Sequence, residues 1–137
     1  MFLLDTNVVS ELRRPRPHGG VLAWFRDVPA AELRLSAVTV GEIQAGIEIT
    51  REQDSARAAE LEAWLDKVLE TYEVLPVDAT AFREWARIMH GQSDTLLQDG
   101  MIGAVATVNR LTVATRNVRD FERLGVKTVN PFGHSER

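Results

Sequence analysis

The stretch Phe2-Leu3-Leu4-Asp5-Thr6-Asn7 contains the features that decide the fold. Three consecutive apolar residues are typical of a short strand buried on both faces, as in a parallel sheet covered by helices. The run ends on an acid, and Thr6 and Asn7 are residue types that cap helices, which predicts a helix over 8–12. A strand that passes directly into a helix is a typical first unit of an α/β fold.

The rest of the chain continues this alternation. Strands are predicted over 33–36, 73–77, 111–115 and 126–129, and helices over 21–27, 38–50, 54–72, 95–110 and 118–124, with a further helix that is capped by Asp78 or Thr80 and ends at Met89. The alternation predicts a three-layer α/β/α sandwich with a mainly parallel central sheet, in one domain over residues 1–137.

Apolar residues at helical spacing predict which helix faces are buried. The expected inward residues are Leu22 and Phe25 in the first of these helices, Leu61, Trp64, Leu65, Val68, Leu69 and Tyr72 in the helix over 54–72, and Phe82, Trp85, Ala86 and Met89 in the next one. We therefore interpret the aromatic residues of these stripes as core or interface residues.

Composition excludes several classes of site. The chain has 137 residues and a net charge of −4, so a partner held on a generally basic surface is excluded. The absence of cysteine excludes disulfides, thiolate zinc sites and a cysteine nucleophile, and the three histidines are scattered. The sequence contains neither a signal segment nor a run of about 20 apolar residues, so we expect a cytoplasmic protein.

Two acids follow predicted strands, where ligands bind in open α/β sheets, and a third lies on a helix whose small residues Gly103 and Ala104 should pack it close to the strand ends. Asp5 ends the first strand, Glu42 lies on a small apolar helix face with Ala45, Gly46 and Ile49 nearby, and Asp99 lies on a similar face. Each has a simpler interpretation that stays open: a helix cap for Asp5, a solvated rim position for Glu42, and a favourable helix-dipole contact for Asp99. Asp94 is the competing helix cap beside Asp99.

Three acids brought together would repel one another, which either raises a pKa or requires a cation. Without cysteine or clustered histidine, the donors are all oxygens, which suits Mg²⁺ or Mn²⁺. A divalent cation held by carboxylates is well suited to hydrolysing phosphodiesters, because it activates water and stabilises the leaving oxygen. It would also offset the negative charge of the chain toward a polyanion.

The same residues resemble the motifs of a known family. Phe2-Leu3-Leu4-Asp5-Thr6-Asn7, the stretch over 35–42 ending on Glu42, the stretch over 99–106 beginning with Asp99, the stretch over 113–121 and Val129-Asn130-Pro131-Phe132 are similar, in order, to the motifs of PIN-domain nucleases of the VapC type, closest to the FitB-like subgroup. The resemblance covers essentially the whole chain.

This resemblance implies a Mg²⁺-dependent (or Mn²⁺-dependent) ribonuclease that acts as the toxin of a toxin–antitoxin pair. It assigns the metal-binding acids to Asp5, Glu42 and Asp99 and supporting hydroxyls to Thr6 and Thr115. Members often have Asp where this chain has Asn117, so either Asn117 or Asp120 supplies the fourth polar position of the catalytic set. A homodimer, or a higher assembly with antitoxin, is implied, with the antitoxin bound in a groove between helices.

Basic residues near the predicted strand ends are candidates for RNA phosphate contacts. These are Arg13, Arg14 and Arg16 in the loop after the first strand, and Arg116 with Arg119 near the fourth. A solvated loop, or pairing of Arg116 and Arg119 with acids such as Asp120, is the alternative.

Two other functions are weighed against the nuclease. The segment over 4–7 is loosely similar to the nucleophile loop of haloacid-dehalogenase-like phosphatases, but that family needs an acid where Asn7 stands and a later lysine near the site. A non-catalytic PIN-like module that binds RNA or protein is favoured only by Asn117.

Overall fold

The computed structural model describes residues 1–135. Its strands are β1 (Phe2–Leu4), β2 (Leu33–Ser36), β3 (Glu73–Leu75), β4 (Thr112–Ala114) and β5 (Thr128–Val129). The α-helices are α1 (Thr6–Glu11), α2 (Gly19–Asp27), α3 (Ala37–Arg51), α4 (Ser55–Thr71), α5 (Ala79–Met89), α6 (Leu97–Val108) and α7 (Val118–Arg123). Three short 3₁₀ helices, η1 (Ala30–Glu32), η2 (Asp94–Leu96) and η3 (Pro131–Gly133), were not predicted.

The strands form one parallel sheet in the order β3-β2-β1-β4-β5. β1 is the central strand, and its Leu4 is in register with Leu35 of β2 and Ala114 of β4. Because all strands run the same way, the residues that follow them emerge at one edge of the sheet. The predicted α/β sandwich with a parallel sheet is confirmed.

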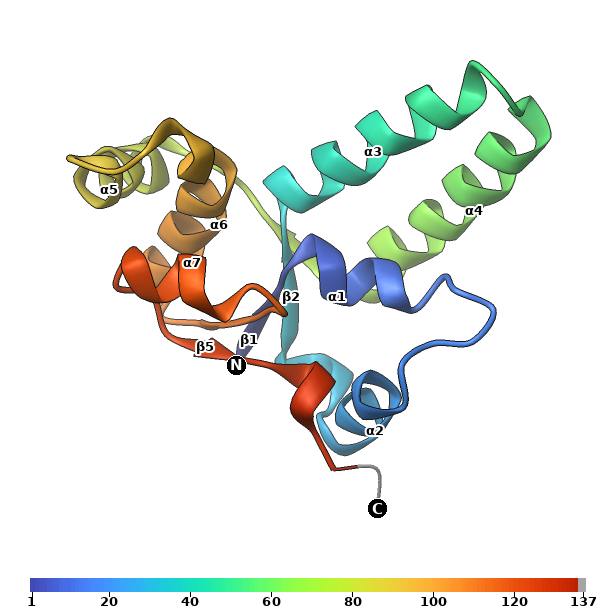
Figure 1. The fold of residues 1–137 in the computed structure, drawn as a ribbon, viewed down its shortest axis with the longest axis horizontal. Coiled ribbons are helices and arrows are strands. Elements are labelled where there is room, and N and C mark those ends of the chain that lie inside the picture. Colours follow the sequence, from blue (N-terminus) through green and yellow to red (C-terminus); the bar gives the residue numbers. More distant parts are fainter. Residues whose placement is uncertain (136–137) are drawn as a thin grey trace.

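Alternate residues of β1 serve the two faces of the sheet. Leu3 packs with Ile102 and Phe121 from α6 and α7, whereas Leu4 packs with Val8 and Trp24 from α1 and α2. Leu3 and Leu4 are both fully buried, as the continuous apolar run predicts. Figure 1 shows α5, α6 and α7 on one side of β1, and α1 and α2 on the other.

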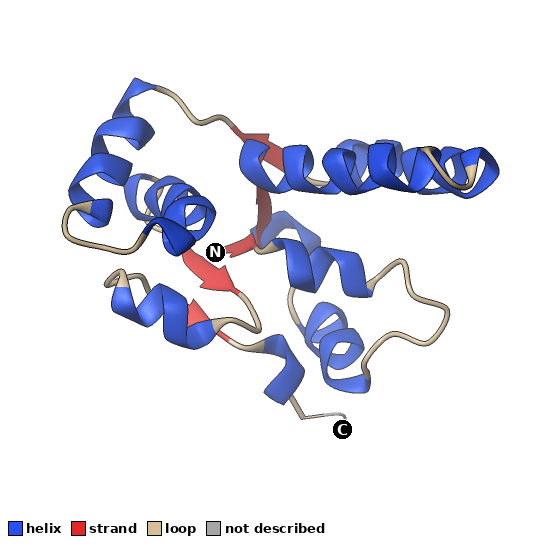
Figure 2. Ribbon diagram, turned by 45° about the horizontal axis from the view of Figure 1, so that its top comes forward, coloured by secondary structure: helices blue, strands red, loops and turns tan. Residues whose placement is uncertain are grey.

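Helices α3 and α4 form a hairpin that projects past the sheet (Figures 1 and 2). A small core of Ile47, Ala58 and Leu65 holds the two helices together. The prediction that the apolar face around Glu42 points toward the sheet is therefore wrong beyond its first turn. Ala45 and Gly46 are exposed and Ile49 is 66% exposed, because this part of α3 extends beyond the sheet.

Parts of the predicted helix stripes are also wrong. Leu22, Leu69, Phe82 and Ala86 are exposed. In α5 the face toward the core contains Ala81, Trp85, Ile88 and Met89, so Phe82 and Ala86 lie on its outer side. The sequence stripe was correct in period and displaced around the helix, because α5 packs mainly on α6 instead of directly on the sheet. No helix within residues 1–135 is long and apolar enough to cross a membrane.

Candidate active site

Asp5 occupies the junction between β1 and α1. Its backbone N–H donates to the Ala114 carbonyl (2.9 Å), and its Oδ1 accepts from the Thr6 backbone N–H (2.8 Å), so Asp5 itself is the helix cap. Its Oδ2 accepts from the Thr115 hydroxyl (2.7 Å) and from Asn7 Nδ2 (3.3 Å). Burial raises the pKa of Asp5, and these hydrogen bonds partly counter the increase. One oxygen of the Asp5 carboxylate therefore caps α1, and the other oxygen faces Thr115 and Asn7 in the candidate site.

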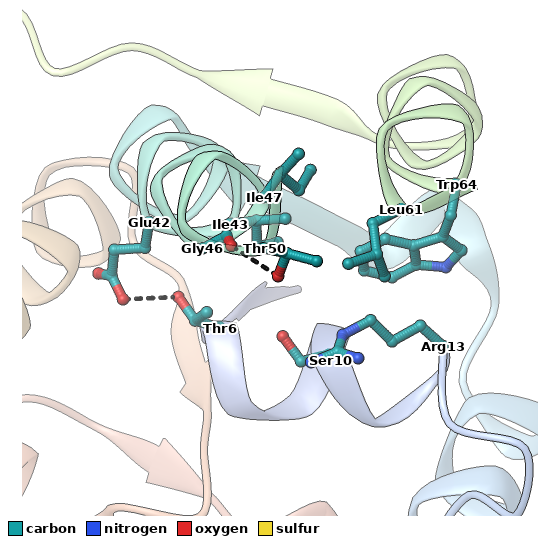
Figure 3. Close-up of a pocket in the computed structure, with 10 residues that line it drawn as sticks. All are labelled: Thr6, Ser10, Arg13, Glu42, Ile43, Gly46, Ile47, Thr50, Leu61 and Trp64. Carbon is teal, nitrogen blue, oxygen red and sulfur yellow. Dashed lines mark hydrogen bonds between the residues drawn. The ribbon is translucent and has the colours of Figure 1, made fainter. Parts of the chain in front are cut away.

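Glu42 reaches the same edge from α3. Ser36 ends β2 and caps α3 by accepting from the Val38 backbone N–H, which places the first two turns of α3 against the end of the sheet. The Thr6 hydroxyl donates to Glu42 Oε2 (3.1 Å), as Figure 3 shows. Burial, and secondarily the negative charge of Asp5, raise the pKa of Glu42. The carboxylate is half-buried and held toward Asp5 instead of extending freely into water.

Asp99 comes from the first turn of α6. Ser93, and not the expected Asp94, caps the preceding 3₁₀ turn, and Asp99 is free of that task. Burial, followed by the negative charges of Asp5, Asp120 and Glu42, raises the pKa of Asp99 to about 6, although the hydrogen bond from Asn117 opposes the increase. Asp5, Asp120 and Glu42 are thus close enough to Asp99 to disfavour its ionisation.

Close packing of α6 positions Asp99. A Cβ on Gly103 would lie 2.8 Å from Val126 Cγ2, so only glycine lets the helix approach the segment before β5 this closely. The small-residue face that the sequence shows after Asp99 is therefore a packing requirement of the helix that carries it.

Asn117 bridges two carboxylates. Its Nδ2 donates to Asp99 Oδ2 (3.1 Å) and to Asp120 Oδ2 (2.8 Å), and its backbone N–H donates to the Thr115 hydroxyl (2.9 Å). Two carboxylate acceptors fix the amide orientation, because only the nitrogen can donate. Asn117 therefore holds the Asp120 carboxylate beside Asp99.

Asn7 was interpreted from sequence only as a capping residue type, and the structure gives it a larger part. Besides its contact with Asp5, its Oδ1 accepts from the Arg116 backbone N–H (3.1 Å), which ties the start of α1 to the loop after β4. Buried Thr39, whose hydroxyl lies 3.4 Å from that of Thr6, was also missed. In the sequence, the position of Asn7 two residues after Asp5 could have indicated a role in the site. For Thr39, the corresponding indication was its position three residues before Glu42.

The arginines that were predicted to contact RNA phosphates have different surroundings in the structure. Arg13 lines a cavity beside Glu42, whereas Arg14 pairs with Glu11 (3.3 Å) and Arg16 is exposed. Arg116 lies over the Phe132 ring, with its guanidinium carbon 4.5 Å from the ring centroid. Arg119 is exposed, and within the described residues neither it nor Arg116 forms an ion pair with Asp120.

The donors fit a hard divalent cation in chemistry. Four carboxylates converge, and none of them forms an ion pair with a basic side chain within residues 1–135. Burial raises the pKa values of Asp5, Glu42 and Asp99, and neighbouring carboxylates add to the increase at Glu42 and Asp99. Within residues 1–135, however, no three acidic or imidazole groups are close enough to form a ready cage. Mg²⁺ does not require such a cage, because it keeps several water ligands and is usually bound through one or two carboxylates directly.

A cavity of about 190 Å³ adjoins the carboxylates, between α1, α3 and α4 (Figure 3). Thr6 and Glu42 form its polar end, and Leu61 and Trp64 lie at its apolar end. Trp64 is half-buried and lines this space, so it is only partly a core residue. The cavity is a continuation of the acidic site toward the projecting hairpin.

The chain is similar in sequence and in structure to known proteins. The model of the PIN domain family matches residues 2–127. Toxin FitB of Neisseria gonorrhoeae is 33% identical over 139 residues, covering 96% of this chain and 99% of its own, and VapC ribonuclease Y4jK of Sinorhizobium fredii is 35% identical over 144 residues, covering 96% and 98%. The crystal structure of FitAcB from N. gonorrhoeae superposes with a TM-score of 0.87 at 33% identity, covering 97% of this chain and 99% of that one.

Proposed function

The chain belongs to the PIN domain family, and on that premise we propose that it is a metal-dependent endoribonuclease acting as the toxin of a toxin–antitoxin pair. One observation carries the proposal: Asp5, Glu42 and Asp120 approach Asp99 from separate parts of the chain, and their charges, after burial, raise the pKa of Asp99 to about 6. The names of the similar proteins, a toxin and a ribonuclease, support the same function. Family membership removes the phosphatase alternative.

In this proposal Asp5, Glu42 and Asp99 hold Mg²⁺ or Mn²⁺, and Asp120 adds the fourth carboxylate. The bound cation would supply the positive charge that binds the scissile phosphate and lowers the pKa of a water nucleophile. The Thr115 hydroxyl and Asn7 hold Asp5 by donating to its Oδ2.

The remaining polar residues orient the other acids. The Thr6 hydroxyl holds Glu42, and Asn117 keeps Asp99 and Asp120 at a fixed separation. Hydrogen bonds to the ionised carboxylates keep them available as ligands despite their burial.

The test is RNA cleavage by antitoxin-free protein. Wild type with Mn²⁺ is expected to cut RNA, whereas wild type in EDTA and Asp99→Asn with Mn²⁺ are not. Asp94→Asn, the same change at an exposed acid five residues away, is the matched control and should cut normally. If wild type and Asp99→Asn cut alike, or if both only bind RNA, the carboxylate mechanism is wrong and the chain is a binding module.

We also propose that an apolar helix of the antitoxin occupies the cavity between α1, α3 and α4. Its apolar end suits a helix face, and its acidic end suits a basic antitoxin side chain directed at Glu42.

Substitutions at two glycines of α3 test whether the antitoxin binds in this cavity. Gly46 lines the cavity and Gly41 does not, and a Cβ added at either position meets nothing within 4 Å. Gly46→Leu should fold, because glycine is a poor helix former, and should lose binding of the co-expressed antitoxin. Gly41→Leu is the matched control. Equal antitoxin binding by both variants would place the partner elsewhere.

A homodimer through the outer face of α5 is proposed as well. Phe82 and Leu97 are 43% and 39% exposed, and Phe82 stacks edge-on against half-buried Trp85 with ring centroids 6.2 Å apart. Apolar groups gathered in this way mark association surfaces. Phe82→Glu should yield monomers in sedimentation experiments under conditions in which wild type is dimeric; a monomeric wild type would contradict the proposal.

A further inference from the structure

Positive charge is concentrated in one segment of this acidic chain. Residues 107–129 contain five basic and two acidic residues, a net charge of +3 in a chain whose total is −4. One of the two acids, Asp120, is held in the carboxylate cluster by Asn117. Glu122 is the remaining acid of the segment.

The five basic residues, Arg110, Arg116, Arg119, Arg123 and Lys127, are all exposed, and we call them the basic strip. Arg119 and Arg123 are four residues apart on α7, whose opposite side buries Phe121, so both lie on the outer face of that helix. Within residues 1–135 none of the five forms an ion pair, which leaves their charge available to a ligand.

The far end of the strip is a second cavity, of about 400 Å³. It is lined by Thr107, Arg110, Leu111, Thr112, Gly125 and Lys127. Thr112 begins β4, so this cavity lies at the amino ends of the strands, opposite the carboxylates. The two sites are separated by the three-residue length of β4, about 10 Å, plus the adjoining loops.

Arg110 occupies a strained position in this cavity. Its φ is +57°, in the left-handed region where glycine usually ends a helix, and the Leu111 N–H donates back to the Ala106 carbonyl (2.8 Å). An arginine therefore occupies a backbone conformation that glycine would adopt without strain. Residues kept in such conformations are often functional.

We propose that the basic strip guides the backbone of single-stranded RNA from the catalytic carboxylates, past α7, into the cavity at Arg110 and Lys127. This inference rests on the proposed ribonuclease function. A polyanion approaching an acidic protein needs a local positive path, and the strip begins at Arg116 beside the site. The large hydrophobic residues that are exposed all lie outside residues 107–129 of the described chain, which favours a phosphate backbone over a protein partner.

The experiment measures RNA binding in EDTA, so that cleavage does not contribute. The variant Arg110→Gln/Lys127→Gln is compared with Lys67→Gln/Arg83→Gln, which removes the same charge from exposed residues of α4 and α5 that have no ion pair among the described residues. Fluorescence anisotropy is recorded with RNAs of about 4 and about 16 nucleotides, the range of site sizes for small single-strand-binding domains.

We expect a weaker Kd for the longer RNA only in the strip variant. Each lost phosphate contact reduces the salt slope of log K by about 0.7 on single strands, so two contacts reduce it by about 1.4. The ratio of the Kd of the strip variant to the Kd of wild type should then fall about sevenfold between 50 and 200 mM salt. Arg123→Gln, midway along the strip, should give about half the slope change. With metal present, KM for the longer RNA should rise in the strip variant while kcat is unchanged.

Three results would overturn the inference: equal binding by the strip variant and its control, an equal loss with the short RNA, or a loss seen only with duplex DNA of similar length. Failure of wild type to cleave any RNA would instead refute the proposed function. The binding comparison in EDTA still decides the role of the strip in that case.

Discussion

Replacing Asp99 with Asn should remove activity and at the same time stabilise the metal-free protein. Burial and three neighbouring carboxylates raise the pKa of Asp99 from 3.8 to about 6. Each unit corresponds to about 1.36 kcal/mol, so the charge at Asp99 costs up to about 3 kcal/mol at neutral pH. Because Asp99 is only half-buried, solvent screening reduces this to about 1–2 kcal/mol. Asn keeps an oxygen that can accept from Asn117, so the geometry is preserved.

The pH dependence gives the prediction its sign. A carboxyl whose pKa is higher in the folded state favours folding when protonated, and this contribution is lost as the pH rises from about 4 through about 6. The gain from Asp99→Asn should therefore be full above pH 7 and small at pH 4. Urea unfolding in EDTA at fixed protein concentration measures it, with Asp66→Asn, an exposed aspartate on α4, as the control. No gain at pH 7.5, or an equal gain at both pH values, would refute the electrostatic reasoning.

Three further predictions follow from individual contacts. Thr115→Val removes the donor to buried Asp5 Oδ2 and should cost about 1–3 kcal/mol in urea unfolding; an unchanged midpoint would mean that this bond contributes nothing. Gly103→Ala forces a methyl group against Val126 and should destabilise by about 1–3 kcal/mol, by thermal unfolding, and a neutral result would show that α6 can move away. Mn²⁺ affinity, measured by calorimetry, should fall as the pH drops through about 6 because Asp99 takes up a proton; a flat profile between pH 5 and 8 would argue that Asp99 is no ligand.

Much of the secondary structure could be predicted from the local sequence. The apolar run over 2–4 predicted a strand buried on both faces, and Leu3 and Leu4 are fully buried. Asp54 was correctly expected at the start of α4, and of the two expected caps for α5, Asp78 and Thr80, the structure has Asp78. These signals are readable because strand burial and helix capping depend on neighbours in the chain. Helix faces were less predictable: the displaced stripe of α5 depended on its packing against α6, a contact between helices that the period alone does not specify.

By itself, the sequence determined that Asp5 ends the first strand and that the chain alternates strand and helix, because both features depend on consecutive residues. Only the tertiary structure decided the strand order β3-β2-β1-β4-β5, which brings Asp5, 108 residues before Val113, next to β4. It also decided that Asn117 donates to two acids and so holds Asp120 beside Asp99. Hydrogen-bond direction and charge proximity are properties of distances between elements, and those distances exist only after the sheet has assembled.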